Sequence, residues 1–142
     1  MFDLDRFKKA QERDYQIALQ EIRSGHKQSH WIWYIFPQLK ELGYSSTAKY
    51  YGLTADEAKA YIADSVLRER LVEISEALLN LESNDATDVM GYPDDLKLRS
   101  CMTLFSEIAP EIQTFQKVLN KFYSGNKDQK TLELLKVRHF PD

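Results

Sequence analysis

The sequence predicts an all-α protein, a single compact globule of about eight short helices spanning residues 1–142. Apolar residues recur at the three- and four-residue spacing of amphipathic helices. Ser, Thr, Asp and Gly stand where such helices would begin and end, and no segment shows the alternation of a strand. With 142 residues, 43% of them hydrophobic and 29% charged, the chain is large enough to bury one core as one domain.

The first helix is expected from Asp3, its N-terminal cap, to Ser24, with Gly25 as its end. Gln11 interrupts the apolar face of this helix, and a buried amide must find hydrogen-bond partners. Two interpretations stay open: a buried Gln11 bonded to a loop backbone, or a Gln11 that faces a site. The apolar face comprises Leu4, Phe7, Tyr15, Ala18 and Ile22.

The most unusual stretch runs from Ser29 to Gln38 and contains both tryptophans, Trp31 and Trp33. Ser29 can cap a short helix through Phe36 that Pro37 then limits. Both faces of that helix would be aromatic, which predicts burial on most sides. A hydrophobic anchor does not need His30 and Gln38 at its ends, so the stretch indicates a site.

Three helices are expected in the middle of the chain: 47–51, 54–63, and one that begins near residue 65. Leucine and isoleucine at heptad spacing along the third predict packing against a neighbouring helix. The second opens with a capping box, Thr at the cap and Glu three residues later. The residues expected to cap or end these helices are Ser45 or Ser46, Gly52, Thr54 with Glu57, and Asp64 or Ser65.

The C-terminal part is expected to hold a turn at 88–90 and helices at 96–108, from Pro110 to about residue 123, and 128–136, with 137–142 as a frayed tail. Lys97 stands at the head of a core-facing stripe that includes Cys101. Either its stem lies on the core while the ammonium stays in water, or the ammonium points into a pocket. Cys101 is expected to be an inert core thiol.

Composition and motifs exclude several classes of function. The net charge of -3 makes a nucleic-acid partner unlikely, since that surface needs clustered Lys and Arg. The five glycines are dispersed, so there is no phosphate-binding loop, and the three histidines lack the spacing of metal ligands. No cofactor or metal is expected. One cysteine, no signal peptide and no membrane-spanning run predict a cytoplasmic protein without a membrane partner.

The remaining signal is a set of aromatic, amide, carboxylate and ammonium side chains from three parts of the chain. Such a set suits a planar, polar ligand such as a nucleotide-like small molecule, which stacks and forms hydrogen bonds. Each residue has an ordinary structural interpretation when taken alone. The candidate ligand-binding residues are Gln11, Trp31, Trp33, Gln38, Asp94, Lys97 and Ser100, and the candidate catalytic residues are Asp95 and His30.

Several motifs resemble the domain-of-unknown-function family 1810. They are Gln11 in RFKKAQ (6–11), the run KQSHWIWYIFPQ (27–38), and DLK (95–97) before SCMTLF (100–105). The resemblance extends over nearly the whole chain. It implies a small bacterial all-helical protein and no established activity. Some members of the family carry the label calpastatin, but nothing in this sequence supports protease inhibition.

The order of an aromatic segment with Gln, an acidic helix, a Leu/Arg helix and a Lys/Met helix is similar to the NADAR family, which hydrolyses N-glycosidic bonds of ADP-ribosyl compounds. The similarity implies that Asp94 or Asp95 stabilises an oxocarbenium-like centre. It also implies that Lys97 meets a phosphate and that Trp31 or Trp33 stacks on the base. The ordinary alternative places both aspartates in the first turn of a helix.

Three hypotheses therefore compete, and whether the protein is an enzyme stays open. A nucleotide-type site predicts that His30, Gln38, Asp95 and Lys97 converge on one pocket. A protein-interaction module without catalysis predicts an exposed Trp31 or Trp33 in an apolar patch, and hence a protein partner. A purely structural role predicts that the tryptophans are core residues and that the polar groups satisfy caps and loops.

Overall fold

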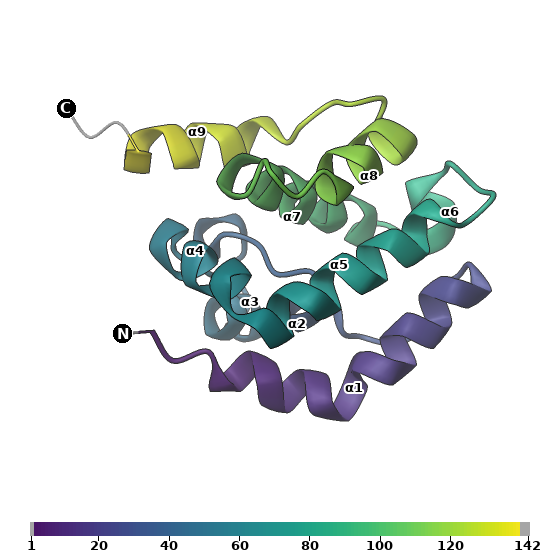
Figure 1. Ribbon diagram of the computed structural model, residues 1–142, viewed down its shortest axis with the longest axis horizontal. Helices are drawn as coiled ribbons and strands as arrows, with labels where there is room; N and C mark the ends of the chain where they lie inside the picture. The colour runs from purple at the N-terminus through teal and green to yellow at the C-terminus, as the bar shows by residue number, and fades with distance from the viewer. Residues whose placement is uncertain (1, 140–142) are drawn as a thin grey trace.

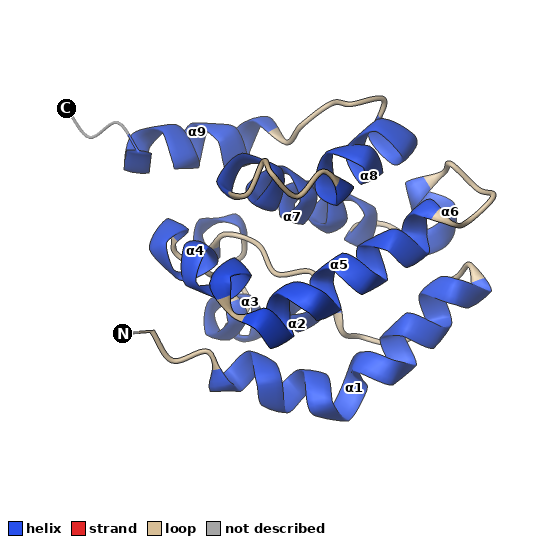
Figure 2. Ribbon diagram, viewed as in Figure 1, coloured by secondary structure: helices blue, strands red, loops and turns tan. Residues whose placement is uncertain are grey.

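A computed structural model describes residues 2–139, with side chains through Lys136. The all-α prediction is confirmed: within these residues the chain forms nine α-helices and one 3-10 helix, and no strand (Figure 2). The elements are α1 (Asp5–Ser24), α2 (Ile32–Ile35), η1 (Lys40–Leu42), α3 (Ser46–Tyr51), α4 (Ala55–Ala63), α5 (Ser65–Leu79), α6 (Ala86–Met90), α7 (Asp94–Ile108), α8 (Thr114–Tyr123) and α9 (Gln129–His139).

The helices stack in layers around α5 (Figure 1). Helix α1 lies along one side and packs against α5 and α2, while α7 and α8 lie on the other side. Helix α8 packs against both α7 and α5, and α9 covers α7 from outside. The short α2 contacts α1, α3 and α7, so it joins the two sides of the molecule.

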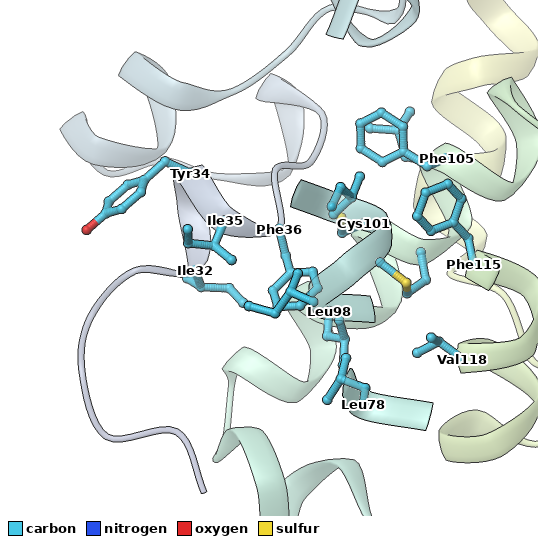
Figure 3. Close-up of a cluster of buried hydrophobic side chains, with 14 of the residues drawn as sticks. Ile32, Tyr34, Ile35, Phe36, Leu78, Leu98, Cys101, Phe105, Phe115 and Val118 are labelled. Atoms are coloured by element: carbon cyan, nitrogen blue, oxygen red, sulfur yellow. The ribbon is translucent and has the colours of Figure 1, made fainter. Parts of the chain in front are cut away.

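The core draws apolar side chains from nearly every helix (Figure 3). The rings of Tyr61, Phe105 and Phe115 form a chain of tilted contacts through it. Cys101 is fully buried beside them, and burial raises the pKa of its thiol well above the usual value. As expected, Cys101 is a buried core residue.

Local capping signals predicted the middle helices well. Ser45 caps α3 by accepting from Ala48 N at 3.0 Å. Thr54 and Glu57 form both bonds of the capping box on α4. Asp64 caps α5 by accepting from the amides of its first turn. These caps need only neighbours in sequence, which is why sequence alone identified them.

Other boundaries differ from expectation. The helix expected from Ser29 shrinks to α2, because the Ser29 hydroxyl donates to Glu21 instead of capping the next turn. Asp3 accepts from Asp5 N, but Leu4 is the residue that precedes α1. Helix α8 begins at Thr114 and not near Pro110.

Helix α9 continues to His139, past its expected end at Lys136. The rest of the expected tail, 140–142, lies outside the described residues. No helix in the described part of the chain is both long and apolar enough to cross a membrane.

Candidate functional site

A hollow of about 320 Å³ lies where α2 meets the start of α3 and the first turn of α7. Four of the predicted site residues line it together: His30, Trp33, Asp94 and Lys97. They come from sequence positions more than sixty residues apart, brought together because α2 packs against both α3 and α7. The other lining residues are Ile32, Tyr34, Ser45 and Thr47.

Asp94 is shared between two lysines. Its Oδ2 is 2.7 Å from the Lys27 ammonium, and its Oδ1 is 3.4 Å from that of Lys97. The Lys97 ammonium also lies over the Trp33 ring, 5.0 Å from its centroid, within the range of a cation–π contact. Lys97 therefore enters the hollow as a cation, with its side chain 28% exposed. The Lys97 ammonium thus borders the hollow, while its side chain stays partly exposed to water.

No pattern in the sequence around Lys27 indicates that this residue lies near the hollow. Its side chain is only 6% exposed, and its ammonium donates to the Ser29 carbonyl at 2.5 Å. The same ammonium lies 4.8 Å from the centroid of the Trp31 ring. A buried ammonium needs such partners to offset its lost hydration. Lys27 thus holds Asp94 in place without itself lining the hollow. The contact joins distant segments of the chain, so it leaves no local pattern in the sequence.

Glu21 on α1 organises the segment that leads into the hollow. Its Oε1 accepts from the amides of Gln28 and Ser29 and from Nε1 of Trp31, at 2.9–3.0 Å. Its Oε2 accepts from the Ser29 hydroxyl at 2.5 Å. Burial alone would raise the pKa of Glu21, but the hydrogen bonds from Ser29, Gln28 and Trp31 outweigh it and lower the pKa to about 2.

The two tryptophans have different surroundings. Trp31 is 1% exposed and packs against Phe36 in the core, so its ring cannot stack on a ligand in this conformation. Trp33 is half-buried and lines the hollow. A methyl group added at Gly43 would lie 2.7 Å from Cη2 of Trp33, so the outer edge of the ring rests against that glycine. Neither tryptophan forms the exposed patch that the interaction-module hypothesis predicted.

Gln11 is buried in a separate place. Its Nε2 donates to the Tyr34 carbonyl at 2.8 Å and to the Tyr61 hydroxyl at 2.9 Å, and its Oε1 accepts from Arg70 at 3.3 Å. It borders a groove of about 470 Å³ between α1 and α5, not the hollow. Gln11 is therefore buried, as the first interpretation expected, but its backbone partner lies in α2 and not in a loop, and its other partners are the side chains of Tyr61 and Arg70.

Asp95, Ser100 and Gln38 also lie away from the hollow. Asp95 is 8% exposed and accepts from the Thr87 hydroxyl at 2.6 Å and from Leu96 N at 2.9 Å. The Ser100 hydroxyl donates back to the Leu96 carbonyl at 3.2 Å. Gln38 is 2% exposed, and its Nε2 has no hydrogen-bond partner within the described residues. Of the four residues expected to converge on one pocket, His30 and Lys97 line the hollow, and Gln38 and Asp95 do not.

Two other hollows have larger volumes but poorer chemistry for a planar anionic ligand. The one of about 570 Å³ beside α7 and α8 has no aromatic side chain in its lining. The groove between α1 and α5 has Tyr15, but three glutamates, Glu12, Glu69 and Glu73, line it with a single arginine. Of these three hollows in the described part of the chain, the one at Trp33 combines an indole ring with a lysine.

The fold is that of a small all-α protein with a hollow lined by polar and aromatic side chains at the junction of three helices. The chain belongs to a family of proteins of unknown function, DUF1810, whose pattern matches residues 1–135. It is similar to the conserved hypothetical protein Rv1873 from Mycobacterium tuberculosis, whose crystal structure has a TM-score of 0.91 to this one. The two are 40% identical, over 94% of this chain and 96% of that one. Comparison with curated proteins gave no match.

Proposed function

We propose that the protein binds a small, planar, anionic molecule of nucleotide type in the hollow at Trp33. The observation that carries this proposal is the placement of the Lys97 ammonium and the Trp33 ring in one hollow, 5.0 Å apart. An aromatic face stacks on a base, and an ammonium receives a phosphate. We also propose a cytoplasmic location, since a lone buried thiol suits a reducing compartment.

The size and polarity of the hollow support a ligand of this class. Its volume of about 320 Å³ lies at the lower end of the range of small-molecule sites, roughly 300–1,000 Å³. The Ser45 oxygen accepts from Ala48 N, which leaves its proton available to a ligand oxygen. With the Thr47 hydroxyl and His30 also in the lining, hydrogen-bonding groups surround the aromatic ring.

A hydrolase acting on ADP-ribosyl or NAD-related compounds is the more specific form of this proposal. Asp94 is the carboxylate in the hollow, so it replaces Asp95 as the candidate for stabilising an oxocarbenium-like centre. His30 lines the same hollow and is exposed, so its ring can reach a ligand there. The two oxygens of Asp94 are 2.7 Å from the Lys27 ammonium and 3.4 Å from that of Lys97, which hold the carboxylate in place at the hollow.

Binding is tested by a thermal-shift screen against nucleotides, NAD and ADP-ribose. A ligand at a hundred times its dissociation constant should stabilise the native state by about 2.7 kcal/mol. We expect W33A and K97A to lose this shift. K59A is the matched control, because Lys59 is exposed on α4 and borders none of the three hollows compared above. If no compound shifts the wild-type protein, the nucleotide proposal is wrong.

Hydrolysis is tested separately, by chromatography of NAD and ADP-ribose after incubation with wild-type protein and with D94N. The hydrolase form predicts product from the wild type and at least a hundredfold less from D94N. If the wild-type protein binds a ligand but forms no product, the binding proposal stands and the hydrolase form of it is wrong.

A further inference from the structure

We propose that the site selects ligands that carry an anionic group beside a planar ring, because Lys97 covers the ring of Trp33 until an anion draws it away. This inference rests on the proposed function and specifies its ligand. Lys97 then determines specificity in two ways: its charge attracts the anion, and its ammonium covers the face of Trp33 on which a neutral ring would stack.

The contacts of Lys97 indicate a side chain that can move. Within the described residues its ammonium has two recorded partners, Asp94 Oδ1 at 3.4 Å and the Trp33 ring at 5.0 Å. Neither is a close hydrogen bond, and the side chain is 28% exposed. An ammonium with three donors and such partners has the capacity to bind a phosphate oxygen.

Departure of Lys97 would not leave Asp94 as an isolated charge. The Lys27 ammonium stays on Oδ2 of Asp94 at 2.7 Å, and its own position is fixed by the Ser29 carbonyl and the Trp31 ring. Glu21, the other carboxylate near this segment, is bound to Ser29 and Trp31. The site therefore has one immobile lysine and one mobile lysine around a single aspartate.

Trp33, by contrast, is restrained at the outer edge of its ring. The outer edge of its indole lies against Gly43, with Ala48 next to the same glycine. A ligand ring can reach the covered face of Trp33 only by displacing Lys97. A neutral ring must break a cation–π contact without compensation, whereas an anionic ligand gives the ammonium a new partner.

The test is isothermal titration calorimetry with matched pairs of probes: the nucleosides adenosine, guanosine, cytidine and uridine, and their 5′-monophosphates. For wild-type protein we expect at least one monophosphate to bind at least tenfold more tightly than its nucleoside. K97M keeps an unbranched side chain without charge. In this variant we expect the affinity for the monophosphate to fall to the affinity for the nucleoside. The nucleoside itself should bind as tightly as in the wild type or more tightly, because the ring is no longer covered.

K59M is the control for loss of a surface charge, and circular dichroism with thermal melting verifies that each variant is folded. A nucleoside that K97M weakens as much as its monophosphate would overturn this inference while leaving the proposed function in place. Monophosphate affinity that survives K97M would overturn both this inference and the proposal that Lys97 receives the phosphate. If no probe binds the wild type, both the inference and the nucleotide proposal are rejected.

Discussion

Glu21 stabilises the approach to the site through its charge. Its carboxylate accepts four hydrogen bonds: from the amides of Gln28 and Ser29, from the Ser29 hydroxyl and from the Trp31 indole N–H. Hydrogen bonds to the ionised form are stronger than those to a neutral acceptor. Glu21 therefore holds the 28–31 segment so that Trp31 enters the core and Trp33 lines the hollow.

This arrangement predicts a pH-dependent effect of E21Q. The folded-state pKa of about 2 lies below the ordinary value of 4.5, so Glu21 stabilises the fold fully above pH 4.5 and loses that contribution as pH falls toward 2. E21Q should lower the free energy of unfolding at pH 7 by about 1–2 kcal/mol, allowing for residual solvent exposure. The difference from wild type should shrink between pH 4.5 and 2, as urea unfolding at several pH values will measure. A difference independent of pH would contradict this role.

Gly43 has a steric role. Its φ of -133° and ψ of 157° are extended angles that any residue adopts, so only space restricts this position. G43A would push into Trp33 and Ala48. We expect a loss of about 1–3 kcal/mol in urea unfolding, with a changed near-ultraviolet tryptophan signal.

The contrasting variant is G25A, whose φ of 95° is strained for alanine but whose surroundings are open. It should destabilise the protein without changing the tryptophan signal. Equal spectra for G43A and wild type would show that Gly43 does not position Trp33.

At the scale of elements, α4 depends on its capping box. Thr54 Oγ1 accepts from Glu57 N at 3.1 Å, while Glu57 Oε1 accepts from Thr54 N at 2.8 Å. T54A should cost about 1 kcal/mol in urea unfolding, because the Glu57 amide loses its acceptor. T47A is the control, since Thr47 lies in the first turn of α3 and has no recorded cap bond. Equal losses in both variants would argue against the cap.

The elements also explain why the aspartate predicted as catalytic was not the one in the hollow. Successive residues of a helix point about 100° apart, so neighbouring aspartates cannot face the same way. Sequence placed both Asp94 and Asp95 near the start of α7. The helix turns Asp94 toward Lys27 and Lys97, and Asp95 toward Thr87 on α6. The rotation of α7 about its own axis, which decides which aspartate faces the hollow, is set by how α7 packs against its neighbours.

For the whole molecule, the fold was largely predictable and the site only in part. Where a capping residue directly precedes a helix, as for α4 and α5, the start of the helix was predicted nearly to the residue. The shortened α2 was not, because Ser29 bonds to Glu21 on another helix. Residue type alone selected four side chains that line the hollow: His30, Trp33, Asp94 and Lys97. Lys27 lies in a polar linker and pairs with Asp94 only when α7 packs beside it, so no local pattern indicated it.

The core as a whole predicts the reactivity of the single cysteine. Cys101 has no exposed surface, and burial raises the pKa of its thiol. It should react with Ellman's reagent only when the protein unfolds, because a buried thiol is neither accessible nor ionised. As urea is added, the reaction rate should rise in proportion to the fraction of unfolded protein. A fast, urea-independent reaction would contradict the packing around α7.

The central claim, that a nucleotide-like ligand occupies the hollow at Trp33, is tested most directly by nuclear magnetic resonance. ¹⁵N-labelled protein is titrated with a nucleoside 5′-monophosphate, and shifts of backbone amides and of both indole N–H groups are followed. We predict shifts at the Trp33 indole and at the amides of Thr47 and Lys97, with little change at Trp31, whose indole is bound to Glu21. Shifts gathered instead at Tyr15 and Arg70, in the groove between α1 and α5, or no shifts at millimolar ligand, would contradict the claim.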